Sequence, residues 1–398
     1  ASNNAVFFGA TSATVQSVEG STTLTVTVPY GANYQYLSVT NLGTNLTGYS
    51  AAPFVVTFPS AGITDFANDG SFSSNSALGV AIGDLNGDGK PDLVVANDNY
   101  GTASIYRNIS VASGSLSFVF VNTVASPSAY MKQVFLADLD GDGRLDLGMS
   151  HYVVNSSGDI QFFRNTTAVN SNSITFTTGP VMVTVGSAWG VRVGDFDGDG
   201  RPDVVAGNVD YINTSSISIF RNLSISGTLS FATKQDIPGF SYPFDLAVGD
   251  LDKDGKTDIV VANLGTNSLL VLHNASGSGS INFTTSSPLT GLSNPRGVAI
   301  GDFDFDGKPD IVVSDQSNSR VAFYLNRNST TGTISFTTTP SLTFATGGSP
   351  FEGLSIGDFD GDGKIDLAVA NTNNTLSVLK NTTSSIGNLS FVNRILYN

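Results

Sequence analysis

The stretch GDLNGDGKPD, residues 83–92, crowds three aspartates and an asparagine into one short glycine-containing loop. The same pattern, D-x-[DN]-x-D-G-x-x-D, occurs six times in the chain. The other five copies are ADLDGDGRLD (137–146), GDFDGDGRPD (194–203), GDLDKDGKTD (249–258), GDFDFDGKPD (301–310) and GDFDGDGKID (357–366). Successive copies begin 52 to 57 residues apart. A constant period of this size indicates an array of structural repeats.

Short apolar runs separated by polar turns surround every loop. In the first copy GVAIGD (79–84) enters the loop, DLVVAN (92–97) leaves it, and ASIYRN (103–108) and SLSFVF (115–120) follow. No helical stripe of useful length interrupts this arrangement. Four strands per repeat predict an all-β fold, a β-propeller with six four-stranded, loop-bearing blades in a ring of six or seven.

The loops have the chemistry of a calcium site. Side chains at positions one, three, five and nine and the backbone carbonyl at position seven can converge, because glycine permits the tight turn. Asn86 replaces one aspartate and keeps its oxygen, whereas Lys253 and Phe305 replace glycine at position four. Position seven is always Lys or Arg, whose side chain we expect to point to solvent. The predicted ligands are Asp84, Asn86, Asp88, Lys90, Asp92, Asp138, Asp140, Asp142, Arg144, Asp146, Asp195, Asp197, Asp199, Arg201, Asp203, Asp250, Asp252, Asp254, Lys256, Asp258, Asp302, Asp304, Asp306, Lys308, Asp310, Asp358, Asp360, Asp362, Lys364 and Asp366.

The charge balance agrees with about six bound Ca²⁺ ions. The loops hold 23 of the 33 acidic residues, and the formal net charge is −15. Six Ca²⁺ ions would offset most of that charge, which otherwise makes each loop repel itself. The same acidity argues against a nucleic-acid partner. No apolar run reaches the roughly 20 residues needed for membrane insertion, and the absence of cysteine rules out disulfides.

The sequence offers no recognisable catalytic set. Its two histidines, His151 and His273, occupy different repeats and different repeat positions. We expect His151, in the slot that ends a second strand, to be a polar turn residue rather than a catalytic base, and His273 to be a surface residue. No nucleophile–histidine–acid combination can be assembled around them. The chain is therefore expected not to be an enzyme, with a polysaccharide-active enzyme as a distant alternative.

A variable position marks a candidate ligand face. It lies six residues before each first aspartate, where the innermost strand begins, on the face opposite the calcium loops. Exposed aromatic rings beside charged side chains suit the recognition of sugars or peptides. The alternative is that these side chains simply plug the central channel. The position holds Leu78, Lys132, Trp189, Phe244, Arg296 and Glu352, of which the last five are the ligand-face candidates.

Twelve N-x-S/T sequons are present, and several follow a third strand at a fixed place in the repeat, as in FRNTT and FRNLS. We interpret these as asparagine-led turns rather than glycosylation sites.

The loops and their period resemble the FG-GAP/VCBS repeats of integrin alpha-chain propellers and bacterial surface proteins, over roughly residues 60–398. The resemblance implies an extracellular, calcium-stabilised propeller, secreted or at the cell surface, that serves adhesion or binds a carbohydrate or protein ligand. Residues 1–20 carry no signal peptide, so we expect a chain that is cytosolic, already processed or excised from a longer one.

Residues 1–58 lack the loop pattern and resemble the later part of an IPT/TIG immunoglobulin-like domain. Their runs TTLTVTV (22–28) and YLSVT (36–40) alternate like half-buried strands. We predict a partial immunoglobulin-like β-sandwich over 1–58 and a propeller over 59–398; the alternative is a motif-less seventh blade. An incomplete sandwich would expose a strand edge to another copy or another protein. The alternative function is thus a structural subunit of a surface fibre or layer that self-associates through residues 1–58.

Overall fold

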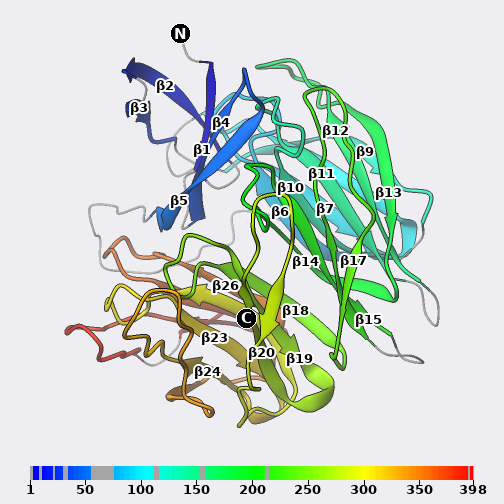
Figure 1. The fold of residues 1–398 in the computed structure, drawn as a ribbon. Helices are drawn as coiled ribbons and strands as arrows, with labels where there is room; N and C mark the ends of the chain where they lie inside the picture. Colours follow the sequence, from blue (N-terminus) through cyan, green and yellow to red (C-terminus); the bar gives the residue numbers. More distant parts are fainter. Residues whose placement is uncertain are drawn as a thin grey trace.

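The computed structural model describes residues 3–8, 11–20, 23–29, 35–54, 76–111, 116–128, 130–152, 157–210, 215–392 and 395–397. These residues form an all-β structure of one five-stranded and six four-stranded sheets (Figure 1). Their helical content is limited to three short 3-10 turns, η1 (Asp98–Tyr100), η2 (Leu264–Thr266) and η3 (Gln316–Asn318). Within the described ranges, no helix is long and apolar enough to cross a membrane.

The five-stranded N-terminal sheet has the strand order β3-β2-β1-β4-β5. Its strands are β1 (Asn4–Phe8), β2 (Thr11–Glu19), β3 (Thr23–Thr27), β4 (Gln35–Asn41) and β5 (Leu46–Phe54). The four-stranded sheets are numbered 1 to 6 along the chain, and in each the strands are adjacent in sequence order.

The bounds of the strands in sheets 1 to 6 are as follows. Sheet 1 contains β6 (Ala77–Gly83), β7 (Asp92–Asn97), β8 (Thr102–Asn108) and β9 (Phe118–Ala125). Sheet 2 contains β10 (Met131–Ala137), β11 (Asp146–His151), β12 (Asp159–Asn165) and β13 (Phe176–Val183). Sheet 3 contains β14 (Ser187–Gly194), β15 (Asp203–Val209), β16 (Ser216–Phe220) and β17 (Gln235–Pro238). Sheet 4 contains β18 (Pro243–Gly249), β19 (Asp258–Asn263), β20 (Ser268–Asn274) and β21 (Phe283–Thr285). Sheet 5 contains β22 (Pro295–Gly301), β23 (Asp310–Asp315), β24 (Arg320–Tyr324) and β25 (Leu342–Ala345). Sheet 6 contains β26 (Pro350–Gly357), β27 (Asp366–Asn371), β28 (Leu376–Leu379) and β29 (Ile395–Tyr397).

The four-strand repeat predicted from the sequence is confirmed. In every sheet the first strand ends one residue before the first aspartate of the loop, and the second strand begins at the ninth-position aspartate. Each acidic loop is therefore the hairpin that joins the first two strands. All neighbouring strands within these sheets are antiparallel, as connections this short require.

Consecutive sheets pack face to face through separate apolar cores. The first strands lie side by side along the series β6, β10, β14, β18, β22 and β26. A buried cluster fills each of the five interfaces between consecutive sheets, for example Val205 and Ile217 of sheet 3 against Leu246 and Ile259 of sheet 4. Burying one such side chain stabilises the fold by about 1.5–3 kcal/mol. The repeated pairing of one sheet with the next is what holds the array together.

The described residues do not close this array into a ring. Val80 of β6 is 59% exposed, whereas Val134, Val191 and Val298, which hold the equivalent position in sheets 2, 3 and 5, are at most 4% exposed. No buried apolar cluster of the described residues joins sheet 6 to sheet 1. The sheets thus have the packing of propeller blades, and the number of blades remains a prediction.

The N-terminal sheet has a small core of its own. Val6 and Phe8 face a cluster with Ala13, whereas Phe7, which points to the opposite side of β1, lies in the core between sheets 1 and 2. The described residues here form a single sheet, so neither the partial sandwich nor the seventh blade is established. The predicted domain boundary at residue 58 falls in 55–75, outside the described residues.

Candidate metal centres

The six acidic loops share one backbone conformation. In the third loop Asp195 accepts hydrogen bonds from the backbone N–H groups of Asp199 and Gly200, at 3.2 and 2.9 Å, and Asp197 accepts one from Asp199 at 3.0 Å. Asp199 in turn accepts from the N–H of Arg201 at 3.0 Å. The loop therefore curls around its own carboxylates, as the pattern predicted.

Positive φ angles make this curl possible. Position four has φ near 70° and is glycine in four loops, but it is Lys253 in the fourth loop and Phe305 in the fifth, with φ of 62° and 61°. A non-glycine residue in the left-handed region costs roughly 1–2 kcal/mol. Lys253 and Phe305 thus adopt, at this cost, the conformation that glycine adopts in the other loops.

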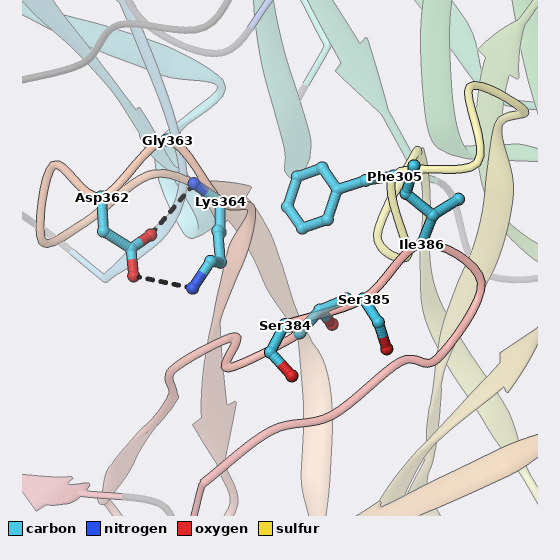
Figure 2. A pocket seen from close by; sticks show the side chains of 8 residues that line it. Phe305, Asp362, Gly363, Lys364, Ser384, Ser385 and Ile386 are labelled. Atoms are coloured by element: carbon cyan, nitrogen blue, oxygen red, sulfur yellow. Dashed lines mark hydrogen bonds and ion pairs between the residues drawn. The ribbon is translucent and has the colours of Figure 1, made fainter.

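The folded loops bring carboxylate oxygens into clusters. One oxygen from each of Asp195, Asp197 and Asp199 lies within 4.8 Å of the other two, and the fifth loop forms the equivalent cluster. In the second and fourth loops the ninth-position aspartate takes the place of the fifth-position one. Three oxygens at this spacing can share one hard cation. Figure 2 shows the sixth loop from close by, beside a pocket of about 300 Å³, with Asp362 turned toward Lys364.

The ninth-position aspartate fixes the loop to the sheet. Asp203 is fully buried; its Oδ1 accepts from the N–H of Asn222 at 2.7 Å and its Oδ2 from the N–H of Phe196 at 3.0 Å. Equivalent pairs of hydrogen bonds occur in the other five loops. This residue was predicted only as a metal ligand, and the structure gives it a second, structural role.

Burial makes these carboxylates harder to ionise. It raises the pKa of Asp92, Asp203 and Asp258 to about 7 and that of Asp310 to about 8, while the backbone N–H donors oppose the shift and neighbouring aspartates add to it. Burial likewise raises the pKa of Asp138 to about 7. A nearby divalent cation would favour the ionised form.

Basic side chains flank the loops, which the sequence-based analysis missed. The Arg164 Nε lies 2.7 Å from Asp140 Oδ2, and Arg221 pairs with Asp197 and Asp199. Lys380 pairs in the same way in the sixth loop. All three immediately precede an asparagine that ends the third strand in sheet 2 and lies just beyond it in sheets 3 and 6, so the recurring R-N and K-N dipeptides were the available signal.

The expectation for the side chains at position seven of the loops has to be corrected. They were expected to point to solvent, but Arg201 Nη1 lies 2.9 Å from Asp199 Oδ2, and Lys308 Nζ lies 3.0 Å from Asp306 Oδ2. Arg201 and Lys308 thus turn back onto the aspartate two residues earlier, because the opposite charges attract at this short separation, and Asp199 pairs with Arg221 as well. The backbone carbonyl at position seven stays a predicted ligand.

Comparison with known proteins places these loops in a family. A family model described as FG-GAP-like repeat matches residues 84–149, 151–206, 207–261, 250–313 and 302–369, which together make up more than half of the chain. The chain belongs to the FG-GAP-like repeat family. The first 83 residues lie outside the match, so the IPT/TIG resemblance of the N-terminal segment remains a prediction.

Two curated relatives match part of this chain. Cartilage acidic protein 1 of Mus musculus and that of Homo sapiens are each 30% identical to this chain over 174 residues. The alignments cover 42% of this chain but only 25% and 24% of the two relatives. The chain thus corresponds to about a quarter of the length of these proteins.

Solved structures share the fold. A putative 6-phosphogluconolactonase from Bacteroides fragilis NCTC 9343 superposes with a TM-score of 0.55 at 14% identity, covering 92% of this chain and 91% of that one. A periplasmic gluconolactonase from Pseudomonas aeruginosa gives a TM-score of 0.55 at 16% identity, covering 98% and 96%. At these identities the similarity concerns the fold alone.

These structures correct the expectation that the FG-GAP chain is not an enzyme. That expectation took the lack of a histidine-centred catalytic set as evidence against enzymatic activity. Two structures with this fold carry the names of lactonases, so the fold is one that hydrolases use. A missing motif therefore does not place this chain outside the enzymes.

The asparagine that follows each third strand of the FG-GAP repeats joins neighbouring sheets. Asn222 is fully buried; its Nδ2 donates to the carbonyl of Pro202 in its own sheet at 2.9 Å and to that of Leu139 in the preceding sheet at 2.8 Å. The same bridges come from the equivalent asparagines of sheets 2, 4, 5 and 6. Its Oδ1 accepts from the N–H of Ser224, and the Ser224 hydroxyl accepts from the N–H of Ser230 at 3.0 Å, so the serine of the sequon also closes this turn, which supports the turn interpretation.

Glycosylation should therefore avoid these positions. If the chain is secreted from a eukaryotic host, we expect glycans in the folded fraction at exposed Asn282 and Asn388 and none at buried Asn165 and Asn222. A glycan on Nδ2 would remove one of its two hydrogen bonds and could not fit in the sheet interface. Glycopeptide mass spectrometry of the monomeric fraction measures this, and a glycan on Asn222 in folded protein would contradict the bridging role.

The five ligand-face candidates lie together, at the ends of the first strands remote from the loops. Lys132 Nζ is 2.7 Å from both carboxylate oxygens of Glu352 and 4.1 Å from the ring centroid of Trp189. The guanidinium carbon of Arg296 is 4.2 Å from the ring centroid of Phe244. These contacts connect sheets 2 to 6, and we call the five residues the mouth cluster. Lys132 and Phe244 are buried within it, as in the plug interpretation.

The two histidines differ in burial and in the carboxylate that each one contacts. His151 ends β11 and is fully buried, with its Nδ1 2.8 Å from Asp159 Oδ1, while Ser128 donates to the other oxygen of that carboxylate. His151 therefore ends the second strand as expected, but it is a buried strand residue held by a carboxylate and not a turn residue. His273 is not merely a surface residue: its Nε2 lies 2.9 Å from Asp252 Oδ2 in the fourth loop.

The N-terminal sheet rests on two of the acidic loops. The N–H of Thr47 in β5 donates to the carbonyl of Gly200 in the third loop. At Gly141 in the second loop, an added Cβ would lie 2.6 Å from the backbone oxygen of Asn45, so only glycine fits. The sheet is thus docked on the loop side of sheets 2 and 3.

Proposed function

We propose that the six loops bind Ca²⁺ and that the ions hold the FG-GAP repeats folded. The main observation behind this proposal is that the six loops, which share one geometry, bring hard oxygen donors together. The basic side chains beside the loops do not balance the negative charge of these donors. Asp302 Oδ1 is buried and has no hydrogen-bond partner among the described residues, as a ligand oxygen facing an absent cation would be. The donor set contains oxygen throughout, which favours Ca²⁺.

Bound ions would relieve the repulsion between the carboxylates of each loop. Each loop holds three or four carboxylates within a few ångströms, and the basic side chains beside them compensate only part of that charge. A Ca²⁺ ion supplied to each loop would neutralise the repulsion and fix the hairpin that joins the first two strands. The predicted ligands remain those of the sequence analysis.

We further propose that the chain is a secreted or cell-surface binding module whose ligand docks at the mouth cluster. Aromatic rings run across this end of the structure, with centroid separations of 5.6 Å for Tyr130–Tyr152, 6.4 Å for Tyr152–Trp189 and 4.6 Å for Trp189–Phe244. Tyr130 and Phe351 are 46% and 36% exposed. Exposed rings beside paired charges favour a carbohydrate, because rings stack on the apolar faces of sugars while the polar groups bind hydroxyls.

Binding to a glycan array in the presence of Ca²⁺ tests this function. We expect the double variant Tyr130→Ala, Phe351→Ala to lose at least about tenfold in affinity for a glycan that the parent binds, since each lost ring contact contributes roughly 0.5–1.5 kcal/mol. The matched control is Phe120→Ala, which removes a 54% exposed ring from β9. Equal losses in both variants, or a parent that binds immobilised proteins and no glycan, would contradict a carbohydrate site at the mouth.

A further inference from the structure

The fourth loop differs from the others in the basic residue beside it. His273 stands immediately before the asparagine that ends β20, where the second, third and sixth loops have Arg164, Arg221 and Lys380. Arginine and lysine can only supply positive charge to a carboxylate at neutral pH. A neutral imidazole can instead donate a nitrogen lone pair to a metal ion. The fourth loop can therefore offer a nitrogen ligand to a metal ion, which the loops flanked by arginine or lysine cannot.

The geometry at His273 is that of a ligand set. Its Nε2 lies 2.9 Å from Asp252 Oδ2 and 4.0 Å from Asp254 Oδ2. One ligand atom from each of these three residues lies within 4.8 Å of the other two. Ligands about 2.1 Å from a tetrahedral ion are about 3.4 Å apart. The two Nε2–Oδ2 separations, 2.9 and 4.0 Å, lie on either side of that distance.

The two closest atoms are also left without other partners. Asp252 is 2% exposed, and its Oδ2 and the Nε2 of His273 are buried atoms that have no polar partner closer than each other among the described residues. A buried carboxylate oxygen without a hydrogen bond is costly unless a cation compensates it. The His273 side chain as a whole is 31% exposed, so an ion could reach the site from solvent.

We propose that the fourth loop binds a first-row divalent transition ion, of the class of Zn²⁺, through His273, Asp252 and Asp254. Nitrogen ligation selects Zn²⁺ over Ca²⁺, which takes oxygen ligands. The other loops lack a neutral nitrogen donor at this position and would bind Ca²⁺ alone, whereas the fourth loop would take Ca²⁺ through its oxygens when zinc is absent. This inference rests on the proposed function only in that the oxygens of Asp252 and Asp254 face a metal.

Zinc binding measured by isothermal titration calorimetry in excess Ca²⁺ tests the proposal on the full chain. We expect one Zn²⁺ per chain for the parent and for His151→Asn, which alters the only other histidine. His273→Arg reproduces the residue of the second and third loops and should weaken zinc binding at least about a hundredfold, since even partners outside the ligand shell contribute 10–100-fold. Arg221→His should add a second zinc site, because it places an imidazole against Asp197 and Asp199.

The outcomes separate this site from the calcium proposal. A parent that binds no zinc in excess Ca²⁺, a His273→Arg variant that binds zinc as the parent does, or an Arg221→His variant without a second ion would overturn it. An unchanged melting temperature of the Ca²⁺-loaded His273→Arg variant shows that it is folded. If Ca²⁺ stabilises every variant while zinc fails to bind, this inference alone fails and the proposed function stands.

Discussion

Replacing Asp203 with alanine should lower the free energy of unfolding by about 4 kcal/mol. The two oxygens of Asp203 accept hydrogen bonds from the N–H groups of Phe196 and Asn222, and the side chain is fully buried. The substitution leaves two buried backbone donors unsatisfied, and each costs roughly 1–3 kcal/mol. The loop between β14 and β15 would then lose the hydrogen bonds that hold it closed and that connect it to Asn222, just after β16.

Urea unfolding with saturating Ca²⁺ measures this effect. Asp203→Asn keeps one acceptor oxygen and should fall between the parent and the alanine variant. Glu19→Ala removes an exposed carboxylate from β2 and should change stability by less than about 0.5 kcal/mol. An Asp203→Ala variant as stable as Glu19→Ala would show that the ninth-position aspartate does not fix the loop.

Removing Ca²⁺ should have the largest effect on the molecule as a whole. An ion that binds only the folded state stabilises it by about 2.7 kcal/mol per site at a hundredfold excess over Kd. With six sites, chelation should lower the melting temperature by roughly 20 °C or more. Differential scanning calorimetry with and without chelator measures it, with Mg²⁺ as the control because it demands a smaller octahedral site. An unchanged melting temperature would contradict calcium stabilisation.

The chelated chain should also respond to pH in a characteristic direction. Burial raises the pKa of Asp203 and Asp258 to about 7 and that of Asp310 to about 8 in the folded state. The folded chain then binds more protons than the unfolded chain, so its stability should fall as pH rises from about 4 to about 8. Bound Ca²⁺ requires the ionised carboxylates and should remove this loss. Melting temperatures recorded across that pH range for the chelated chain and for the Ca²⁺-loaded chain distinguish these two behaviours.

Much of the repeat could be predicted because its determinants are local. The position of each loop between two strands follows from an apolar run on either side of a glycine-permitted turn, as in 79–97. The mouth cluster also followed from register: Lys132, Trp189 and Glu352 hold the same repeat position, so any arrangement that aligns the first strands brings them together.

What could not be predicted depends on contacts between distant segments. Arg221 follows the first aspartate of its loop by 26 residues, and nothing in that interval shows that the third strand returns to Asp197. The docking of β5 on Gly200 involves residues outside the repeat, so no periodicity points to it. The alternation of 22–28 and 36–40 predicted β3 and β4 correctly, but strand alternation carries no information about which sheet a strand joins.

The number of Ca²⁺ ions bound per chain tests the central claim most directly. Native mass spectrometry of the protein equilibrated with Ca²⁺ should show six ions, and five for Asp199→Ala or Asp92→Ala, each of which removes one predicted ligand from a single loop. A parent count of two or fewer would mean that most of the six loops, despite their common geometry, are acidic turns that bind no metal.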